Sequence, residues 1–326
     1  MLVILMPVPP PLSASPLACA PCHQRETQSF SRAGMTRALE SVRDSAILKS
    51  NPRLTAKISG YSYEIVRTGD ESIYSITDGK DTIRVPIKWA FGQGTTGQTY
   101  VFEREGHWYE SRVSYFSALQ GLDLTLGAQN IAPHNLLEAA GRFTEPGEMG
   151  QCFDCHATNV AKSPPLDLSG MIAGIQCERC HGATDAHLRT MAPMRKLGAL
   201  DAEEMSDLCG ECHRTWSEVA TNGPRGILNV RFQPYRLANS KCYDVEDVRI
   251  RCTACHDPHQ ALETSAAVYD AKCQACHSKS KPASPCRVAT KDCVTCHMPR
   301  LELPGAHKKF TDHKIRVVKV NEPYPD

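Results

Sequence analysis

The motif Cys-x-x-Cys-His occurs seven times in this chain of 326 residues, and no other sequence feature constrains the fold as strongly. The seven copies use fourteen of the sixteen cysteines. Their cysteines are Cys19 and Cys22, Cys152 and Cys155, Cys177 and Cys180, Cys209 and Cys212, Cys252 and Cys255, Cys273 and Cys276, and Cys293 and Cys296. Their histidines are His23, His156, His181, His213, His256, His277 and His297.

The spacing within each motif is that of a covalent haem attachment site. Two thiols three positions apart on a helical turn can add to the two vinyl groups of one haem, and the next residue directs an imidazole at the iron. We therefore predict seven covalently bound haem c groups, held by the fourteen motif cysteines, with the seven motif histidines as proximal iron ligands. The chain has only eight phenylalanines and three tryptophans, so porphyrins are expected to fill much of its interior.

Two other readings of paired cysteines fit less well. Zinc ribbons combine two Cys-x-x-Cys pairs in one tetrahedral site and do not need a histidine directly after every pair. Thioredoxin-like redox chemistry uses one such motif near a strand-helix-strand unit. The sevenfold repeat therefore favours haem.

Haem attachment and thiol handling take place on the exported side of the membrane, which predicts a periplasmic, cell-surface or extracellular protein. Residues 1–18 combine an apolar start, several prolines and a small-residue stretch. They resemble the end of a secretory signal peptide without its charged region, with a disordered tail as the alternative. No later apolar run is long enough for a transmembrane helix.

Motif density predicts the domain organisation. Six motifs lie between Cys152 and His297, which leaves too little polypeptide to bury a conventional core around each. We expect a first haem motif and a helix over 19–54, the helix itself covering residues 25–48, then an antiparallel β-subdomain over 55–120 and a dense six-haem domain over 121–326. The predicted fold class is mainly α, with sparse secondary structure organised around stacked haems and a small antiparallel β-subdomain near the N-terminus.

Alternating runs predict the strands of the β-subdomain at 61–66, 72–76 and 82–87, separated by glycine-containing turns. Gly92, Gly94 and Gly97 match the spacing of a dinucleotide-binding fingerprint. The phosphate cradle of that fingerprint needs a helix after the glycines, whereas residues 98–104 have the pattern of a strand. A glycine-rich hairpin without nucleotide binding is therefore predicted.

A low-spin haem needs a second axial ligand. Six histidines lie outside the motifs, which is one fewer than the predicted haems, so at least one iron must bind methionine or another group, or keep an open position. The candidate distal ligands are His187, His259, His307, His313, His134 and Met35, the last for the first haem, while His107 is expected to be a solvated histidine beside a turn. A surface histidine is the alternative for each of the others, and core packing for Met35.

Sequence position narrows the roles of these candidates. His259 and His187 follow motif histidines so closely that they belong to the proximal side of those haems and should reach neighbouring ones. His307 and His313 lie where the C-terminal segment can fold back over the haems. The remaining cysteines, Cys242 and Cys286, are predicted to form a disulfide in an exported protein, with two free thiols as the alternative.

Three segments carry a family resemblance: Cys252-Thr253-Ala254-Cys255-His256-Asp257-Pro258-His259, Cys293-Val294-Thr295-Cys296-His297-Met298-Pro299 and Phe310-Thr311-Asp312-His313. With them the last 180 or so residues resemble the superfamily of multihaem cytochromes that contains cytochrome c554 and the octahaem nitrogen-compound oxidoreductases. The resemblance implies stacked haem pairs and bis-histidine ligation, with His187, His259 and His313 as cross-chain ligands. The Cys-x-x-Cys-Lys motif of the related ammonia-forming nitrite reductases does not occur in this sequence.

The leading functional hypothesis is an electron carrier with no catalytic residues, whose redox partners are other cytochromes, a membrane quinol-oxidising complex or an extracellular acceptor. An oxidoreductase that acts on a small nitrogen or sulfur compound at one open haem is the second. A subunit of a membrane complex or extracellular filament is the third. The formal net charge is +1, without a basic stripe, so no nucleic-acid binding is expected.

Overall fold

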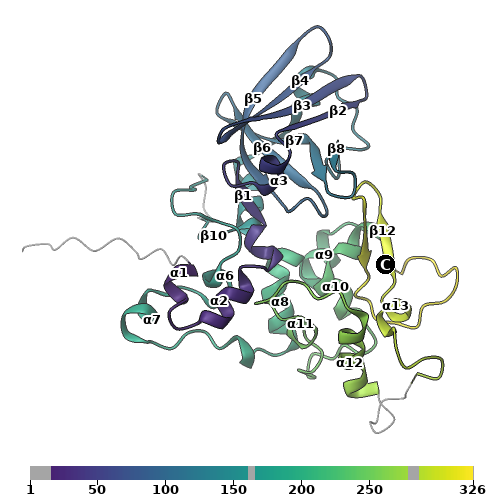
Figure 1. The fold of residues 1–326 in the computed structure, drawn as a ribbon. Coiled ribbons are helices and arrows are strands. Elements are labelled where there is room, and N and C mark those ends of the chain that lie inside the picture. The colour runs from purple at the N-terminus through teal and green to yellow at the C-terminus, as the bar shows by residue number, and fades with distance from the viewer. Residues whose placement is uncertain (1–15, 161–165, 278–285, 326) are drawn as a thin grey trace, which may run out of the picture.

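The computed structural model of the protein describes residues 16–160, 166–277 and 286–325. Most of the predicted signal segment, residues 1–15, lies outside the described residues. The described chain has two parts, a large curled sheet and a body of short helices below it (Figure 1). The motif turns belong to the second part and to its border with the sheet.

The sheet is antiparallel and contains nine strands in the described residues. Seven strands follow one another in chain order from β2 to β8, while β1 pairs with β5 and β9 pairs with β7. β2 also contacts β8, so the sheet is nearly closed. The strands are β1 (Leu39–Ser41), β2 (Arg53–Ile58), β3 (Tyr61–Thr68), β4 (Glu71–Thr77), β5 (Thr82–Phe91), β6 (Gln98–Arg104), β7 (His107–Phe116), β8 (Gly121–Leu124) and β9 (Gly141–Thr144).

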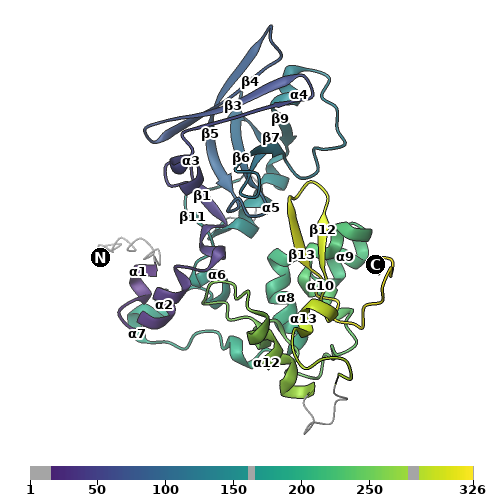
Figure 2. The same cartoon turned by 45° about the vertical axis from the view of Figure 1, so that its right-hand side comes forward.

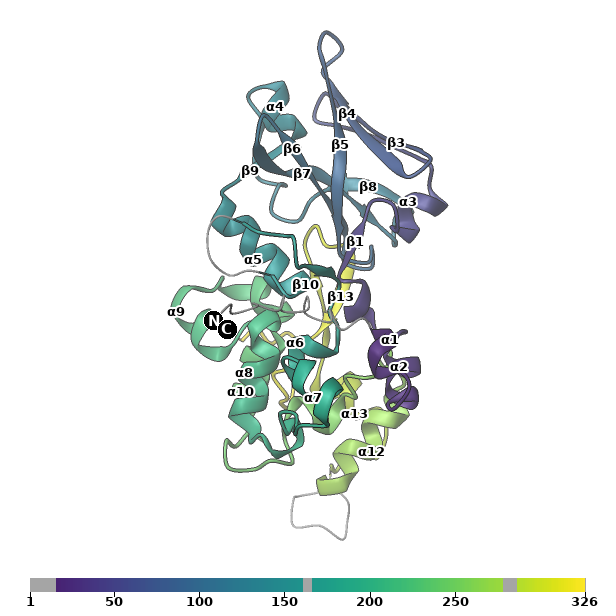
Figure 3. The same cartoon turned by 90° about the vertical axis from the view of Figure 1, so that its left-hand side faces the viewer.

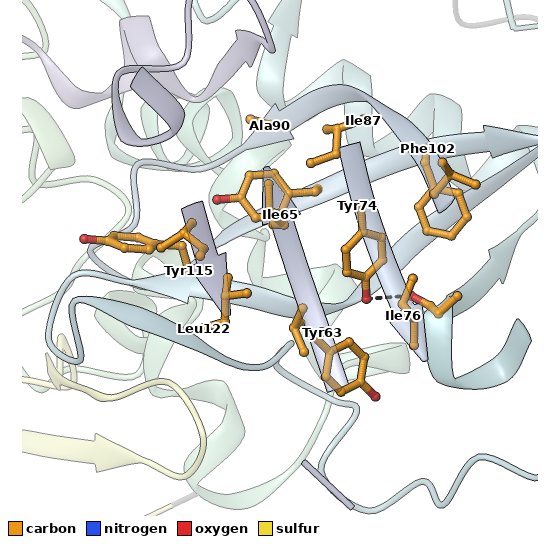
Figure 4. Packing of buried hydrophobic residues seen from close by; sticks show 14 of the residues in the cluster. Tyr63, Ile65, Tyr74, Ile76, Ile87, Ala90, Phe102, Tyr115 and Leu122 are labelled. Atoms are coloured by element: carbon orange, nitrogen blue, oxygen red, sulfur yellow. Dashed lines mark hydrogen bonds between the residues drawn. The ribbon is translucent and has the colours of Figure 1, made fainter. Parts of the chain in front are cut away.

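Alternating side chains give this sheet its own apolar core. Ile65 and Ile76 are buried between neighbouring strands, and the rings of Tyr63 and Tyr74 stack with their centres 6.4 Å apart. The Tyr74 hydroxyl donates a hydrogen bond of 3.0 Å to the carbonyl of Ala140 (Figure 4). This bond attaches the end of helix α4 (Leu136–Ala140) to the sheet. The predicted strands are confirmed, because their period of two matches the buried face.

The glycine-rich segment is the connection between β5 and β6, as predicted. Gly92, Gly94 and Gly97 all have positive φ, a region that costs other residues free energy. A Cβ on Gly92 would lie 2.6 Å from the carbonyl oxygen of Gly97. The segment therefore builds a tight hairpin connection, and no helix follows it.

The remaining elements are short. The helices other than α4 are α1 (Pro16–Cys19), α2 (Gln24–Phe30), α3 (Ala46–Ser50), α5 (Pro146–His156), α6 (Cys177–His181), α7 (Asp185–Thr190), α8 (Ala202–His213), α9 (Trp216–Asn222), α10 (Gln233–Ala238), α11 (Cys252–Cys255), α12 (Ala266–His277) and α13 (Cys293–His297). Single 3-10 turns are η1 (Gly34–Arg37), η2 (Leu197–Ala199) and η3 (Gly226–Arg231). Two small hairpins pair β10 (Ala157–Thr158) with β11 (Ile172–Ala173) and β12 (Arg300–Leu303) with β13 (Lys308–Thr311).

The predicted fold class, mainly α with a small β-subdomain, is wrong. The sheet starts before residue 55 with β1 and β2 and extends beyond residue 120 with β8 and β9. The predicted helix over 25–48 is also wrong, because Leu39–Ser41 forms hydrogen bonds with β5 as strand β1 and Gly34 lies in a separate 3-10 turn. Strands of three or four residues are too short to show a period in the sequence.

The clustered part of the apolar core lies in the upper part of the molecule. In the described chain, the two clusters of buried hydrophobic side chains lie between residues 39 and 173. Helix α5 connects the parts: its buried Met149 and Phe153 pack beneath the sheet, and its last turn carries a Cys-x-x-Cys-His motif. Figure 3 shows α5 between the sheet above and helices α8 and α10 below. Past residue 173, the buried hydrophobic side chains of the described chain, among them Met205, Val219 and Tyr235, form no such cluster.

Candidate functional site

All seven motifs form a single helical turn. Three motifs end the helices α5, α8 and α12, and three form the short helices α6, α11 and α13. In the first motif the amide of His23 donates a hydrogen bond of 2.8 Å to the carbonyl of Cys19, which completes the turn after α1. Residues i, i+3 and i+4 of a helical turn lie on one face. Both thiols and the imidazole of each motif can therefore reach one planar group.

Three motif histidines each have a second imidazole opposite them. The ring centres of His23 and His187 are 6.4 Å apart, with 36° between the ring planes. His181 and His259 are 6.0 Å apart at 18°. His256 and His313 are 6.2 Å apart at 42°. Each pair joins a motif histidine to one of the predicted distal ligands.

These distances fit an iron between two imidazoles. A metal at about 2 Å from each coordinating nitrogen, with about 1.1 Å from nitrogen to ring centre, places the two ring centres roughly 6 Å apart. The six side chains thus leave the space that a bis-histidine haem iron needs.

Hydrogen bonds at the other ring nitrogen orient several of these imidazoles. Nδ1 of His156 donates to the carbonyl of Ala38 at 2.8 Å, Nδ1 of His187 to that of Ala192 at 2.8 Å, and Nδ1 of His297 to that of Arg316 at 2.8 Å. Nδ1 of His313 donates to the carbonyl of Thr311 at 3.0 Å. Because a carbonyl only accepts, the proton is on Nδ1 and Nε2 keeps its lone pair for a metal.

Burial favours the same neutral form of the ring. It lowers the pKa of His156 and of His213, and it lowers the pKa of His313 to about 4. Only a neutral imidazole can coordinate iron. These three rings are therefore held in the state that a haem site requires.

Two buried guanidinium donors next to the motif turns lack a hydrogen-bond partner in the described residues, Nε of Arg179 and Nε of Arg231. Arg179 belongs to the motif of α6. Arg231 lies two residues before Gln233. The amide oxygen of Gln233 accepts a hydrogen bond of 3.2 Å from Nδ1 of the motif histidine His213. A haem propionate is an acceptor that such donors bind. The donor set therefore also fits haem.

Other motif histidines are not paired in this way. Within the described part of the chain, His156, His213 and His297 make no ring contact with a second imidazole. The ring of His156 instead lies edge-on to Phe91, with the centres 5.2 Å apart. Haem irons bound at these three positions would need a different sixth ligand or would keep an open position.

The remaining predicted ligands lie away from the motif histidines. Nε2 of His307 donates to a carboxylate oxygen of Asp123 at 2.8 Å, which ties the β12–β13 hairpin to β8. His134 is exposed before α4, and Met35 lies half-buried in η1, where its carbonyl accepts a hydrogen bond from Ile175. His107 is exposed and packs on Phe143. The structure brings none of these four to an imidazole pair.

Cys242 and Cys286 are both exposed and are not joined in the structure. Cys242 has a motif cysteine, Cys276, in its surroundings. The sulfur of Cys286 accepts a hydrogen bond of 3.4 Å from the amide of Val288. The predicted disulfide between them stays a prediction.

Sequence reasoning missed the charged residues that position the site. Arg236 is fully buried and donates two hydrogen bonds, of 2.8 and 3.0 Å, to the carboxylate of Asp312, the residue before His313. Arg316 binds the same carboxylate at 2.7 Å. The signal available in the sequence was an acidic residue directly before a candidate ligand, but its partner lies 76 positions away. Figure 2 shows the C-terminal hairpin β12–β13 beside α10, which carries Arg236.

Comparison with known proteins places these features in context. Residues 123–182, which include the motif turns ending at His156 and His181, match the family model described as cytochrome c554 and c-prime. The multiheme cytochrome MtrA of Shewanella baltica (strain OS185) is 28% identical over 211 residues, covering 56% of this chain and 53% of the relative. The chain thus spans about half the length of the curated relative it matches.

A solved structure, that of the outer cell wall cytochrome OcwA, matches with a TM-score of 0.53 at 13% sequence identity. The match covers 92% of this chain and 78% of the other. At this identity the similarity is one of fold. It includes the sheet as well as the helical part, since it spans nearly the whole chain. In the described residues no helix is both long and apolar enough to cross a bilayer.

Proposed function

We propose that this chain, a multihaem c-type cytochrome, transfers electrons between redox partners outside the cytoplasm. The family-model match and the similarity to a multiheme cytochrome support this class, which the repeated motif predicts. When bound, the haems supply one-electron redox chemistry at iron. The chain itself holds and spaces them, through the cysteines and histidines of the seven motifs.

The observation that carries this proposal is the set of three imidazole pairs at ring distances of 6.0 to 6.4 Å. We assign His187 as the distal ligand of the haem at His23, His259 of the haem at His181, and His313 of the haem at His256. Two strong axial ligands leave an iron without a free position. That is the arrangement of an electron carrier.

Packing of the motif helices supports transfer between the sites. α8 contacts α5 and α11, α11 contacts α12, and α12 contacts α13. Burial and the neighbouring Cys177 thiol raise the pKa of Cys19, so the first and third motifs are also neighbours. Electron tunnelling decays steeply with distance, and a helix-to-helix contact brings the two attached haems as close as the polypeptide allows.

We further propose seven haems, export by a signal peptide, and a location in the periplasm or at the cell surface. Its proposed redox partners are other cytochromes, a membrane quinol-oxidising complex or an extracellular acceptor. The protein can also be a subunit of a membrane complex or of a filament. The two similar proteins are described as a multiheme cytochrome and as an outer cell wall cytochrome, which agrees with a location outside the cytoplasm.

A second candidate function is an oxidoreductase acting on a small nitrogen or sulfur compound. It is favoured by His156, His213 and His297, which have no imidazole opposite them in the described residues. An iron with one protein ligand keeps a position where a small molecule can bind.

Electron paramagnetic resonance of the oxidised protein separates the two functions. Electron transfer predicts low-spin signals from at least the three bis-histidine haems and spectra that nitrite or hydroxylamine leaves unchanged. A stoichiometric high-spin signal that responds to either compound would instead establish the oxidoreductase.

A further inference from the structure

The second variable residue of three different motifs meets at one point in the structure. These residues are Asp154 in the motif of α5, Arg179 in that of α6 and Glu211 in that of α8. Nη2 of Arg179 lies 3.0 Å from a carboxylate oxygen of Glu211 and 3.6 Å from one of Asp154. One cation therefore bridges two anions that belong to two other haem attachment sites.

The bridge is sheltered and touches the attachment thiols themselves. The Arg179 side chain is 16% exposed, so its ion pairs are screened less than surface pairs are. Its Nη2 is 4.0 Å from Sγ of Cys212, and Sγ of Cys155 donates a 3.5 Å hydrogen bond to the carbonyl of Glu211. The sulfur of Cys155 also neighbours that of Cys212. The motifs of α5, α6 and α8 are thus in direct contact.

The other cysteine of the α8 motif makes a different contact. Cys209 neighbours Cys252 of α11, and α8 packs against α11. The two cysteines of α8 therefore touch separate neighbours. Cys212 lies at the motifs of α5 and α6, and Cys209 lies at the motif of α11.

We infer that the haem site of α8 is a three-way junction, which joins the sites of His181, His156 and His256, and that Arg179 is the positioning residue that holds the sites of His156, His181 and His213 together. One path then runs from the site of His23 through those of His181, His213 and His256 to those of His277 and His297. The site of His156 is a side branch, enclosed by Phe91 of β5 and the carbonyl of Ala38.

This inference rests on the proposed function, because it concerns the route that electrons take. A positive charge near an iron favours its reduced form, and a negative charge favours its oxidised form. A charge at the junction should therefore act on three haems together, whereas a charge beside a single motif acts on one.

The test follows resolved haem methyl NMR signals of the holoprotein through a redox titration. In Arg179→Met, the midpoint potentials of the haems at His156, His181 and His213 should fall. In Glu211→Gln, the potentials of the same three haems should rise. Arg179→Lys, which keeps the charge, should stay close to the parent protein. Arg53→Met is the matched control, because Arg53 is an exposed cation that pairs with Glu64 on the sheet.

A shift confined to one haem, or no shift, in both charge variants would overturn the junction. Haem content by mass and low-spin signals are recorded on the same samples. If the parent protein lacked low-spin haems, the proposed function would fail. If it had them and the three-haem response were absent, only the junction would fail.

Discussion

At the residue scale, a buried guanidinium determines where the C-terminal ligand lies. Arg236 and Asp312 both have fully buried side chains, and the guanidinium of Arg236 also lies over the ring of Tyr324, 4.6 Å from its centre. The hydroxyl of Ser240 donates a hydrogen bond of 2.9 Å to the carbonyl of His313. The segment around His313 is thus fixed by polar contacts to α10 and to the turn that follows it.

Removing one partner of this ion pair should be costly. Asp312→Asn leaves the charge of Arg236 buried and uncompensated, which destabilises a protein by about 3–5 kcal/mol. Chemical denaturation of the holoprotein should show this loss, together with a new high-spin signal from the haem at His256. The control, Asp247→Asn, removes an exposed pair with Arg249 and should change neither. A variant of Asp312 that kept both stability and spin state would refute the positioning role.

The three distal ligands give a second residue-level prediction. His187→Ala, His259→Ala and His313→Ala should each convert one haem from low to high spin, because each removes one of two axial imidazoles. His307→Ala is the matched control and should leave the spectrum unchanged, since Nε2 of His307 binds Asp123. Loss of a low-spin signal in the His307 variant, or its retention in the other three, would contradict the assignment.

Much of the haem site could be predicted from the sequence, but the choice among histidines could not. The motif spacing specifies the attachment cysteines and proximal ligands because that chemistry is local. Proximity in the chain predicted that His187 and His259 reach haems other than those of the motifs they follow, and the structure places their rings opposite His23 and His181. His307 and His313 have similar positions in the sequence. Only the fold reveals that Asp123, 184 residues from His307, binds its ring.

At the element scale, strands can be predicted from the sequence where apolar and polar residues alternate over a long enough run, and cannot be predicted where the run is too short. The runs that became β3, β4 and β5 are long enough to alternate visibly. β1, β8 and β9 have three or four residues each; β1 and β9 are defined by pairing with distant strands, and β8 by a hairpin with β7. The predicted helix over 25–48 fails for the same reason, because pairing with β5 overrides local helix propensity at residues 39–41.

The connection between β5 and β6 offers a test of the sheet's geometry. Gly92→Ala should destabilise the protein by about 1–3 kcal/mol, because positive φ and a backbone contact combine there. Gly79 also has positive φ, but a Cβ on it would meet nothing within 4 Å. Gly79→Ala should therefore cost less in chemical denaturation. Equal losses would show that close approach to Gly97 has no energetic role.

At the scale of the whole molecule, the two parts differ in what stabilises them. The sheet has tyrosines, isoleucines and phenylalanines in its core, whereas the apolar clusters of the described chain do not extend past residue 173. Helices of four to twelve residues are marginal in isolation. The helical part should therefore depend on covalent haem for its interior.

This difference predicts a partly folded apoprotein. Hydrogen exchange of chain produced without haem attachment should show protected amides in β3 to β7 and rapid exchange in α8 to α12. The holoprotein serves as the control and should be protected in both parts. Equal protection of the helices without haem would mean that polypeptide alone forms their core.

The most direct test of the central claim is the intact mass of the denatured protein from a host that matures c-type cytochromes. Because thioether bonds survive denaturation, the account predicts the mass of the exported chain plus seven haems. A red protein with fewer attached haems would contradict the seven-site assignment. A colourless protein with the mass of the bare chain would contradict the whole account.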